Sequence, residues 1–377
     1  MPTPLTEMSS QKFRFWSFIS MALLVFVHGY NLHIRFLQPW TIPGEPLTFT
    51  TFTEYFLANG IFRFRIPMLF VISGFLYALH DHQPYKQRIQ KRFRTLMLPY
   101  LLWSAVGLLL TYFLELFPFS RDIVASTNLT RIDAERLFLH DHRWYELLGQ
   151  WILFPLSFQL WFIRVLFVYN LAYPALRWCV THATGRAFFF PTVLLMWLST
   201  MGLYFFEGEG ILFFSLGIWL QKNNFNIDIP PRYLNPILWG FVFITLSLVK
   251  TWLAFTDTSM MGNAVYPLLI ILHKLIIVSG LISAWYGSDR VVNWCMKRRW
   301  FVWLSAFSFI IYALHAPAIV FAVEWSARTF HYFPLYRILT FVILPTVIII
   351  VSITFGALVR KAMPRIYGIL TGGRGLS

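Results

Sequence analysis

Charged residues are scarce in this chain. Asp, Glu, Lys and Arg together make up 12% of its 377 residues, whereas soluble domains usually carry about 25%. Hydrophobic residues account for 58%, aromatic residues for 19%, and the mean hydropathy is +0.61. So little charge excludes a soluble globular domain. The composition therefore predicts an integral membrane protein that crosses the bilayer several times.

Cysteines and acidic residues are also few. The two cysteines, Cys179 and Cys295, fall in loops that we place in the cytoplasm, so we expect no disulfide framework. Basic residues outnumber acidic residues by 31 to 16, which gives a net charge of +15. The basic residues lie in short loops between apolar runs, where topology and lipid headgroups account for them. We therefore expect membrane lipids as partners, and no nucleic acid.

The apolar runs predict an all-α transmembrane bundle. We expect one domain over residues 1–377, with spans between about 10 and 359 and a short cytoplasmic tail over 360–377. No small-residue cleavage site follows the first apolar run, so that run is expected to stay as a span. The bias of Lys and Arg toward alternate loops places both termini in the cytoplasm. About ten runs are long enough to span, namely 15–34, 60–79, 96–115, 157–177, 187–206, 209–221, 235–255, 264–286, 301–323 and 337–359.

One histidine lies inside the first apolar run. His28 follows the stretch from Phe15 to Val27, and no purely structural membrane helix needs an imidazole there. An ionisable residue within a span indicates function by default, and an imidazole can take and return a proton near neutral pH. The alternative is that His28 only hydrogen-bonds a carbonyl group inside the bundle. We interpret His28 as a candidate general base.

Other cationic and proton-transferring side chains are expected in the same outer layer of the membrane as His28. A guanidinium inside a span costs about 2.5–3.5 kcal/mol at the helix centre, so several of them together indicate a polar cavity. Arg63 near a span end is also explained by contact with outer headgroups. The side chains expected in this layer are Arg63, Arg65, Arg164, Tyr312 and His315.

No cluster of acidic residues appears inside the predicted spans. The acidic residues fall at the outer ends of the spans, as Glu207 and Glu209 do. A cavity lined by the basic layer alone carries net positive charge and suits an anionic ligand such as a phosphate or a carboxylate. We expect no metal site.

Four segments resemble a set of motifs in a fixed order. The first is His28. The second, Pro67 to Leu76, reads PMLFVISGFL, resembles P-x-F-F-x-I-S-G-[FY]-L, and is followed by a basic loop ending in KRFRTLMLPY. The third, Leu160 to Leu166, resembles L-W-F-L-x-x-L, and the fourth, Phe307 to His315, resembles S-F-x-I-Y-L-x-H. Over residues 10 to about 355 the chain resembles the acyltransferase family 3 of membrane proteins.

The resemblance implies transfer of an acyl group, often acetyl, from acyl-coenzyme A to a hydroxyl of a cell-envelope carbohydrate or a lipid-linked acceptor. It also implies a bacterial inner membrane, with acyl-coenzyme A as a co-substrate and no permanently bound cofactor. His28 is then the base or a transient acyl carrier, and Arg65 and Arg164 stabilise the oxyanion or orient the thioester. The substrate-binding residues implied are Arg14, Arg63, Arg92, Arg94, Trp161, Tyr312 and His315.

Three alternatives stay open. Many members of the family carry an arginine eleven residues before the histidine, where this chain has Ser17, and Arg14 one turn away is a substitute. The loop containing Arg92 and Arg94 is also explained as a topological anchor, in which case the loop 297–299 is the other candidate for donor binding. The protein could instead be a carrier or flippase for an anionic glycan precursor, or a membrane subunit without catalysis. The sequence leaves the oligomeric state open.

Overall fold

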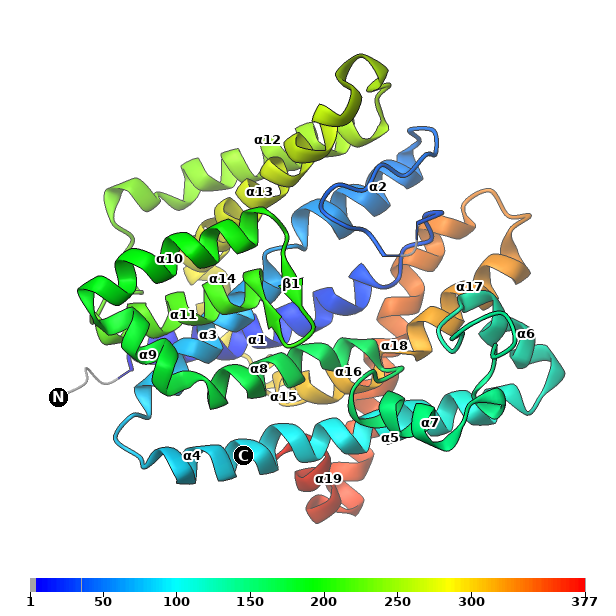
Figure 1. The fold of residues 1–377 in the computed structure, drawn as a ribbon, viewed down its shortest axis with the longest axis horizontal. Helices are drawn as coiled ribbons and strands as arrows, with labels where there is room; N and C mark the ends of the chain where they lie inside the picture. The colour runs from blue at the N-terminus through cyan, green and yellow to red at the C-terminus, as the bar shows by residue number, and fades with distance from the viewer. Residues whose placement is uncertain (1–4, 35, 377) are drawn as a thin grey trace.

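The protein is nearly all helical in a computed structural model that describes residues 5–34 and 36–376 (Figure 1). The first half of the chain forms helices of α, π and 3-10 type. In chain order these are α1 (Glu7–Val27), α2 (Phe49–Phe56), η1 (Leu57–Ile61), α3 (Arg65–Leu79), α4 (Tyr85–Arg92), η2 (Phe93–Met97), α5 (Leu98–Glu115), α6 (Pro118–Thr127), η3 (Leu139–Asp141), α7 (Trp144–Ile152), η4 (Phe158–Leu160), α8 (Trp161–Leu171), α9 (Tyr173–Thr181) and α10 (Ala183–Leu198).

The second half begins with a small antiparallel hairpin, in which Gly202 pairs with Glu207. Helices make up most of the remainder. The elements are β1 (Gly202–Leu203), β2 (Phe206–Glu207), α11 (Gly208–Lys222), η5 (Arg232–Leu234), α12 (Pro236–Phe255), η6 (Ser259–Ala264), α13 (Val265–Gly287), α14 (Asp289–Met296), α15 (Arg299–Ser305), α16 (Ser308–Leu314), α17 (Ala318–Phe330), α18 (Tyr336–Ala362) and α19 (Pro364–Thr371).

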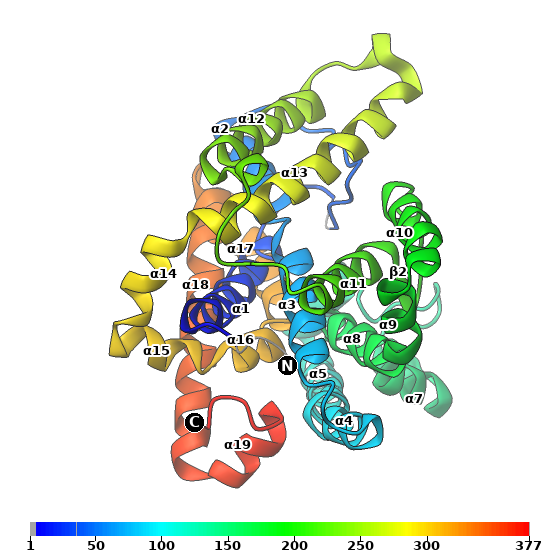
Figure 2. The ribbon, with the colours of Figure 1, turned by 90° about the vertical axis from the view of Figure 1, so that its left-hand side faces the viewer.

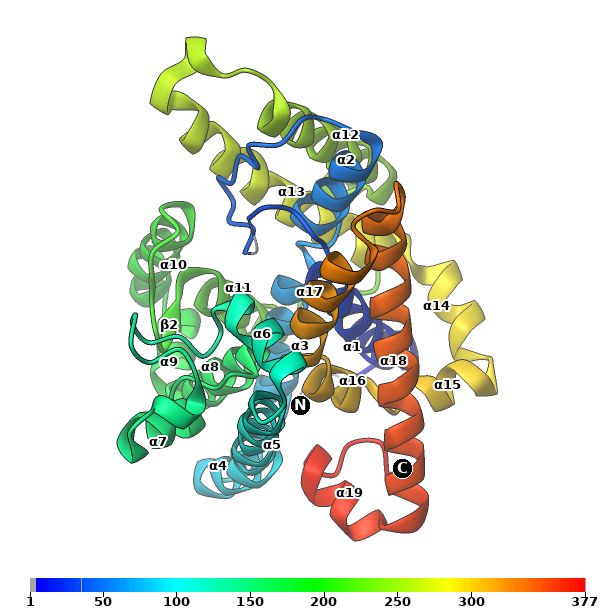
Figure 3. The same cartoon turned by 90° about the vertical axis from the view of Figure 1, so that its right-hand side faces the viewer.

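Helix α1 lies in the middle of the bundle and packs against α3, α14, α16 and α18 (Figures 1 and 2). The α12–α13 pair lies on one side of α1, and α4 and α5 lie on the other. Figure 3 shows α18 running beside α1 and α17, with α19 folded back below the bundle. The core around α1 is aromatic, since Phe13, Phe15 and Trp16 are buried on it. Segments far apart in the sequence therefore meet along one central helix.

Helices α3 and α11 pack closely because glycines face the contact. A Cβ atom on Gly74 would collide with the Phe214 carbonyl oxygen, and one on Gly217 would collide with the Val71 carbonyl oxygen. Small residues allow membrane helices to approach until their backbones touch. Gly74 lies in the Pro67 to Leu76 motif, so this part of the motif serves helix packing.

The helices support a membrane protein. Fewer of them are long and apolar enough to span a bilayer than the ten or so spans predicted from the sequence. Five continuous helical segments are long and apolar enough to cross a bilayer among the described residues. The pair α16 and α17, bent by 57°, makes a sixth if it is one span. The number of spans and the cytoplasmic location of the termini stay predictions. The five segments are Phe49–Leu79, Tyr85–Glu115, Pro236–Phe255, Ser259–Gly287 and Tyr336–Ala362.

Several predicted spans differ from the helices observed, including the fourth, which is divided at Ala172 into α8 and α9. The first helix ends at Val27 rather than at residue 34, because the chain leaves the helix where Gly29 packs against Pro345 of α18. The fifth predicted span stops at Leu198, where the chain turns into the hairpin. The ninth is divided into α15, α16 and α17. Hydropathy alone detects neither a close helix contact nor a chain reversal, so the predicted ends of these spans were wrong.

Candidate functional site

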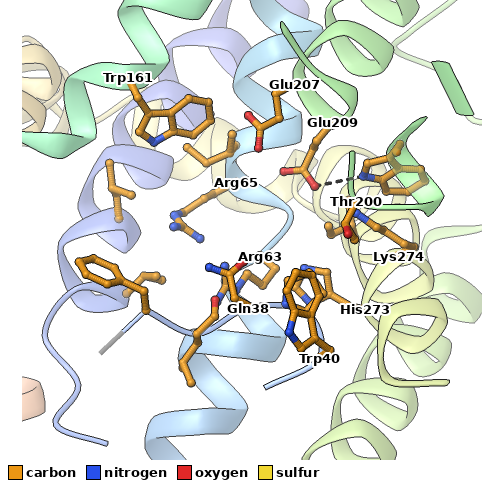
Figure 4. A pocket seen from close by; sticks show the side chains of 18 of the residues that line it. Gln38, Trp40, Arg63, Arg65, Trp161, Thr200, Glu207, Glu209, His273 and Lys274 are labelled. Atoms are coloured by element: carbon orange, nitrogen blue, oxygen red, sulfur yellow. Dashed lines mark hydrogen bonds between the residues drawn. The ribbon is translucent and has the colours of Figure 1, made fainter. Parts of the chain in front are cut away.

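A cavity of about 370 Å³ opens at the C-terminal end of α1. Residues from the loop after α1 and from α3, α8, α10, α11 and α13 complete its wall. We call it the His28 cavity, and Figure 4 shows charged side chains of both signs facing it. The structure brings four of the predicted site residues together here, namely His28, Arg63, Arg65 and Trp161.

The two arginines reach the cavity because a π-helix precedes them. In η1 the Phe62 amide donates to the Leu57 carbonyl at 2.9 Å, a spacing of five residues that widens the helix. Arg63 donates from Nη2 to the Leu37 carbonyl at 2.7 Å, and Arg65 donates from Nη1 to the Phe62 carbonyl at 2.7 Å. The buried Nε atoms of both have no hydrogen-bond partner among the described residues. Both guanidinium groups therefore retain donors for a ligand.

His28 is the C-terminal cap residue of α1 and lies between two rings. Its imidazole stacks on that of His315, with ring centroids 5.6 Å apart and planes at 17°, and meets Phe158 edge-on at 4.9 Å. His315 is fully buried behind His28 and does not line the cavity; its Nδ1 lies 3.2 Å from the Ile311 carbonyl oxygen. Of this stacked pair, His28 thus lines the cavity, and His315 packs behind it.

Two carboxylates also line the His28 cavity, which corrects the expectation of a purely cationic site. Glu209 accepts a hydrogen bond from the Trp197 indole at 3.1 Å. The backbone of Glu207 is fixed because its carbonyl accepts from the Tyr169 hydroxyl at 3.0 Å. The sequence predicts that both residues lie at the end of a helix. It does not predict the short hairpin that brings them to the cavity, because strands of two residues show no recognisable pattern. Lys274 faces the same region, with its ammonium 4.9 Å from the Trp197 ring centroid.

A buried lysine that sequence reasoning overlooked lies behind the cavity. Lys250 of α12 is fully buried, and its Nζ lies 2.8 Å from both the Asn59 carbonyl oxygen and Nδ1 of His273. Asn59 belongs to η1, and His273 lines the cavity. Lys250 has no salt bridge among the described residues. The available signal was a lysine inside an apolar run of α12, where a charge is costly.

Arg164 is not part of this cavity, contrary to the predicted oxyanion role. Its guanidinium lies over the Tyr204 ring, 3.6 Å from the centroid, and donates to the Leu153 carbonyl and the Tyr204 hydroxyl. The guanidinium of Arg164 therefore bonds to Tyr204 in the hairpin turn and to Leu153, the residue that follows α7. The depth of Arg164 along α8 did not reveal which neighbour its side chain faces.

The predicted basic loop before α5 is helical, because it forms α4 and η2, and its Arg88 makes structural contacts. This arginine stacks over Tyr77 and donates to Asp81, which also pairs with Lys222. Burial alone would raise the pKa of Asp81, but hydrogen bonds from these cations lower it below its usual value. Two other arginines of the loop, Arg92 and Arg94, line neither of the cavities described in this section. The contacts favour the anchor interpretation of this loop.

A second cavity, of about 460 Å³, lies next to the first along α1. We call it the Arg14 cavity, after the arginine that donates to the Ser305 hydroxyl and the Val302 carbonyl, both at 2.7 Å. Tyr312, another predicted binding residue, lines it and donates to the Gln159 carbonyl at 2.6 Å. Arg374 also lines it, although the tail after residue 360 was predicted to be a simple extension.

The two cavities are adjacent on three helices. Along α1 the wall passes from Met21 to Leu24, and along α3 from Leu69 to Ile66. On α8, Trp161 faces the His28 cavity while the next residue faces the Arg14 cavity. Residues 14 and 28 are about 20 Å apart along a helix axis. A layer of side chains therefore separates a basic chamber near the start of α1 from a chamber with a histidine at its end.

No three His, Cys, Asp or Glu side chains within the described ranges gather as metal ligands. The residues that line the two cavities supply imidazole, guanidinium, ammonium and carboxylate groups. Such groups, arranged in adjacent cavities within helices apolar enough to span a bilayer, define an integral membrane protein with an internal reaction or transport site.

Comparison with known proteins decides between these two classes. A model of the acyltransferase domain matches residues 15–359, so the chain belongs to acyltransferase family 3, and acyl transfer is its activity. The chain is 26% identical over 357 residues to the succinoglycan biosynthesis protein ExoH of Rhizobium meliloti (strain 1021), covering 91% of this chain and 88% of ExoH. No solved structure matches the chain significantly. The family expected from the four motifs is confirmed.

Proposed function

We propose that the protein transfers an acyl group, acetyl in the simplest case, from acyl-coenzyme A to a hydroxyl of a cell-envelope saccharide. The observation that carries this proposal is the pair of adjacent cavities. The Arg14 cavity offers cationic side chains for a phosphorylated donor, and the His28 cavity offers a base beside two arginines. The relationship to ExoH, a succinoglycan biosynthesis protein, supports a polysaccharide or its lipid-linked precursor as the acceptor.

The reaction requires that a base and an oxyanion donor meet the same carbonyl group. His28 removes the proton of the acceptor hydroxyl as its oxygen attacks the thioester carbonyl carbon. Arg65, and Arg63 beside it, stabilise the negative charge that develops on the carbonyl oxygen. The carbon–sulfur bond then breaks, and the proton passes to the sulfur, which releases coenzyme A as a thiol. The part of the donor that carries the acyl group has to cross only the layer of side chains between the two cavities.

The His28 cavity has the side chains that bind sugars. Trp40, Trp161 and Trp197 offer apolar ring surfaces, while Glu207 and Glu209 accept hydrogen bonds from hydroxyl groups. Carboxylates at this position disfavour a strongly anionic acceptor next to them. We therefore propose a neutral sugar residue as the acceptor group, in a bacterial inner membrane with the Arg14 cavity on the cytoplasmic side.

Purified protein in detergent tests this proposal directly. We expect it to release free thiol from acetyl-coenzyme A and to transfer radioactive acetyl to an envelope oligosaccharide, whereas protein lacking His28 should do neither. Acyl-coenzyme A of other chain lengths, assayed in parallel, would define the donor. A carrier for glycan precursors should ignore the thioester, so uptake of such a precursor into vesicles without thiol release would overturn the proposal in favour of that class.

Lys250→Met is expected to lower transfer about tenfold, because a hydrogen bond to a charged group contributes roughly 1.5–3 kcal/mol. The substitution removes the donor that holds Asn59 and His273. Methionine fills a similar volume but leaves the Asn59 carbonyl and Nδ1 of His273 without their donor, so the thermal unfolding midpoint should also fall. Rates of transfer and melting curves of the two proteins provide the measurement. The exposed Lys91→Met is the matched control, and equal rates in both variants would contradict a supporting role for Lys250.

A further inference from the structure

The last residues of the chain form a glycine-rich loop against the Arg14 cavity. Helix α18 ends at Ala362, and α19 turns back beneath the bundle, where Trp103 of α5 donates to the Leu370 carbonyl at 2.9 Å (Figures 2 and 3). The chain then continues as Gly372, Gly373, Arg374 and Gly375. The expected simple tail is therefore a folded element of the site.

Two of these glycines are required by the structure. Gly372 and Gly375 have φ angles of 61° and 74°, in the left-handed region that other residues adopt at a cost. A Cβ atom on Gly372 would also collide with the Thr95 carbonyl oxygen, and one on Gly375 with the Ala306 carbonyl oxygen. The loop is thus seated with its backbone directly on η2 and on the turn between α15 and α16.

This position of the loop places Arg374 on the wall of the Arg14 cavity. Its Nη1 donates to the Thr95 and Thr371 carbonyls at 2.8 and 2.9 Å, and its guanidinium lies 4.8 Å from the Phe309 ring centroid. The hydrogen bonds of Arg374 within the described part of the chain are both made by Nη1, so Nε and Nη2 remain as donors. Arg14 of α1 lines the same cavity, and no Asp or Glu among the described residues does. Two arginines therefore line one chamber with no acidic side chain of residues 5–34 or 36–376 on its wall.

A neighbouring cleft extends this basic surface. It measures about 350 Å³, shares Arg14 with the cavity, and is lined by Lys297, Arg299 and Arg360, while no Asp or Glu of the described residues lines it. Arg360 donates to the Gly375 carbonyl at 3.0 Å, so the loop also joins the two spaces. An anion with several phosphate groups can contact cations in both spaces, whereas a single carboxylate uses only one of them.

We propose that residues 372–375 form a phosphate-binding loop in which Arg374, together with Arg14, binds the phosphates of a nucleotide-bearing donor. This inference rests on the proposed function for the identity of the donor as a coenzyme A thioester. The planar fork of Arg374 is held by its two backbone contacts, so its remaining donors are already oriented for phosphate oxygens. The residue does not reach the reacting carbonyl group, which places it in donor binding rather than in catalysis.

Binding of free coenzyme A to the full-length protein in detergent tests the loop without any turnover. Arg374→Gln is expected to raise the Kd roughly tenfold to hundredfold, as for loss of hydrogen bonds to a charged group. Arg374→Lys should fall between this variant and the parent, because lysine keeps the charge and loses the fork. The matched control is Arg365→Gln, which removes an exposed arginine of α19 that lines neither space.

The kinetics give the second measurement. Arg374→Gln should raise the KM for acetyl-coenzyme A by a similar factor and leave kcat nearly unchanged, and Arg374→Lys keeps the test informative if glutamine impairs folding. Unchanged Kd and KM in both variants, with the parent active, would overturn the phosphate-binding loop alone. Binding of coenzyme A that depends on Arg374 in a protein that transfers no acyl group would instead support the loop and overturn the proposed function.

Discussion

His28→Ala is expected to reduce acyl transfer by about 10² to 10⁴, the usual contribution of a general base. The imidazole is the only ring of the stacked pair that lines the cavity, so His315 cannot replace it. Binding of coenzyme A should not change, because the Arg14 cavity does not include residue 28. The initial rate of acetyl transfer and the Kd for coenzyme A are the two quantities to compare.

The control for this variant is His331→Ala, which removes an exposed histidine outside the cavity. Melting curves of both variants would separate loss of the base from loss of the fold. Transfer at the parental rate in a folded His28→Ala protein would eliminate the assigned base. A stable acetyl adduct on His28, trapped at low temperature without acceptor, would show that the residue carries the acyl group instead.

Arg65→Gln is expected to lower kcat about 10²-fold to 10³-fold, the effect of removing one donor to an oxyanion. The KM for acetyl-coenzyme A should change little, because the interaction is made chiefly in the transition state. Arg65→Lys should recover part of the rate, since it restores positive charge without the bidentate geometry. Steady-state kinetics in both substrates would measure this difference.

Arg290→Gln, which removes an exposed arginine of α14, is the matched control for the Arg65 variants. A parental kcat in Arg65→Gln, with Arg63→Gln instead inactive, would assign the oxyanion contact to Arg63. Parental rates in both would place the oxyanion donor elsewhere in the cavity, with Lys274 as the next cation on its wall.

The sequence was sufficient to find the residues whose presence in an apolar run is costly. His28, Arg63 and Arg65 each interrupt such a run, and the structure places all three on one cavity wall. Their agreement has a physical reason, because a charge kept inside a membrane helix needs a polar environment. The same reasoning applies to Lys250, which lies in an equally apolar run in α12 and is fully buried. The sequence therefore contained the signal for Lys250, although it was overlooked.

Other parts of the site depend on contacts that no local pattern encodes. Arg164 is also a charge in an apolar run. Its guanidinium nevertheless donates to Tyr204 and to the Leu153 carbonyl and does not line the His28 cavity. Glu207 and Glu209 enter the cavity because of a short hairpin, and four residues in two strands are too few to give a period. Helical depth predicts the level of a residue in the bundle but not the direction of its side chain.

The tail illustrates a different limit. Glycines in a sequence indicate turns. The role of Gly372 and Gly375, however, depends on close contact with the carbonyl groups of Thr95 and Ala306, which are distant in the sequence. A prediction from residues 360–377 alone therefore had no means of placing Arg374 beside Arg14.

The π-helix η1 sets the direction in which the side chains of Arg63 and Arg65 face. A π-turn contains one residue more than an α-turn, so it takes up one extra residue while the helix after it keeps its phase. If residues 57–61 wound as an α-helix instead, one residue would be left over, and everything after it would rotate by about 100° relative to α2. Arg63 and Arg65 would then face different neighbours even though neither had been changed. The cationic wall of the His28 cavity thus depends on the phase of a helix as well as on its residues, so a substitution that makes 57–61 wind as an α-helix would move side chains that it does not touch.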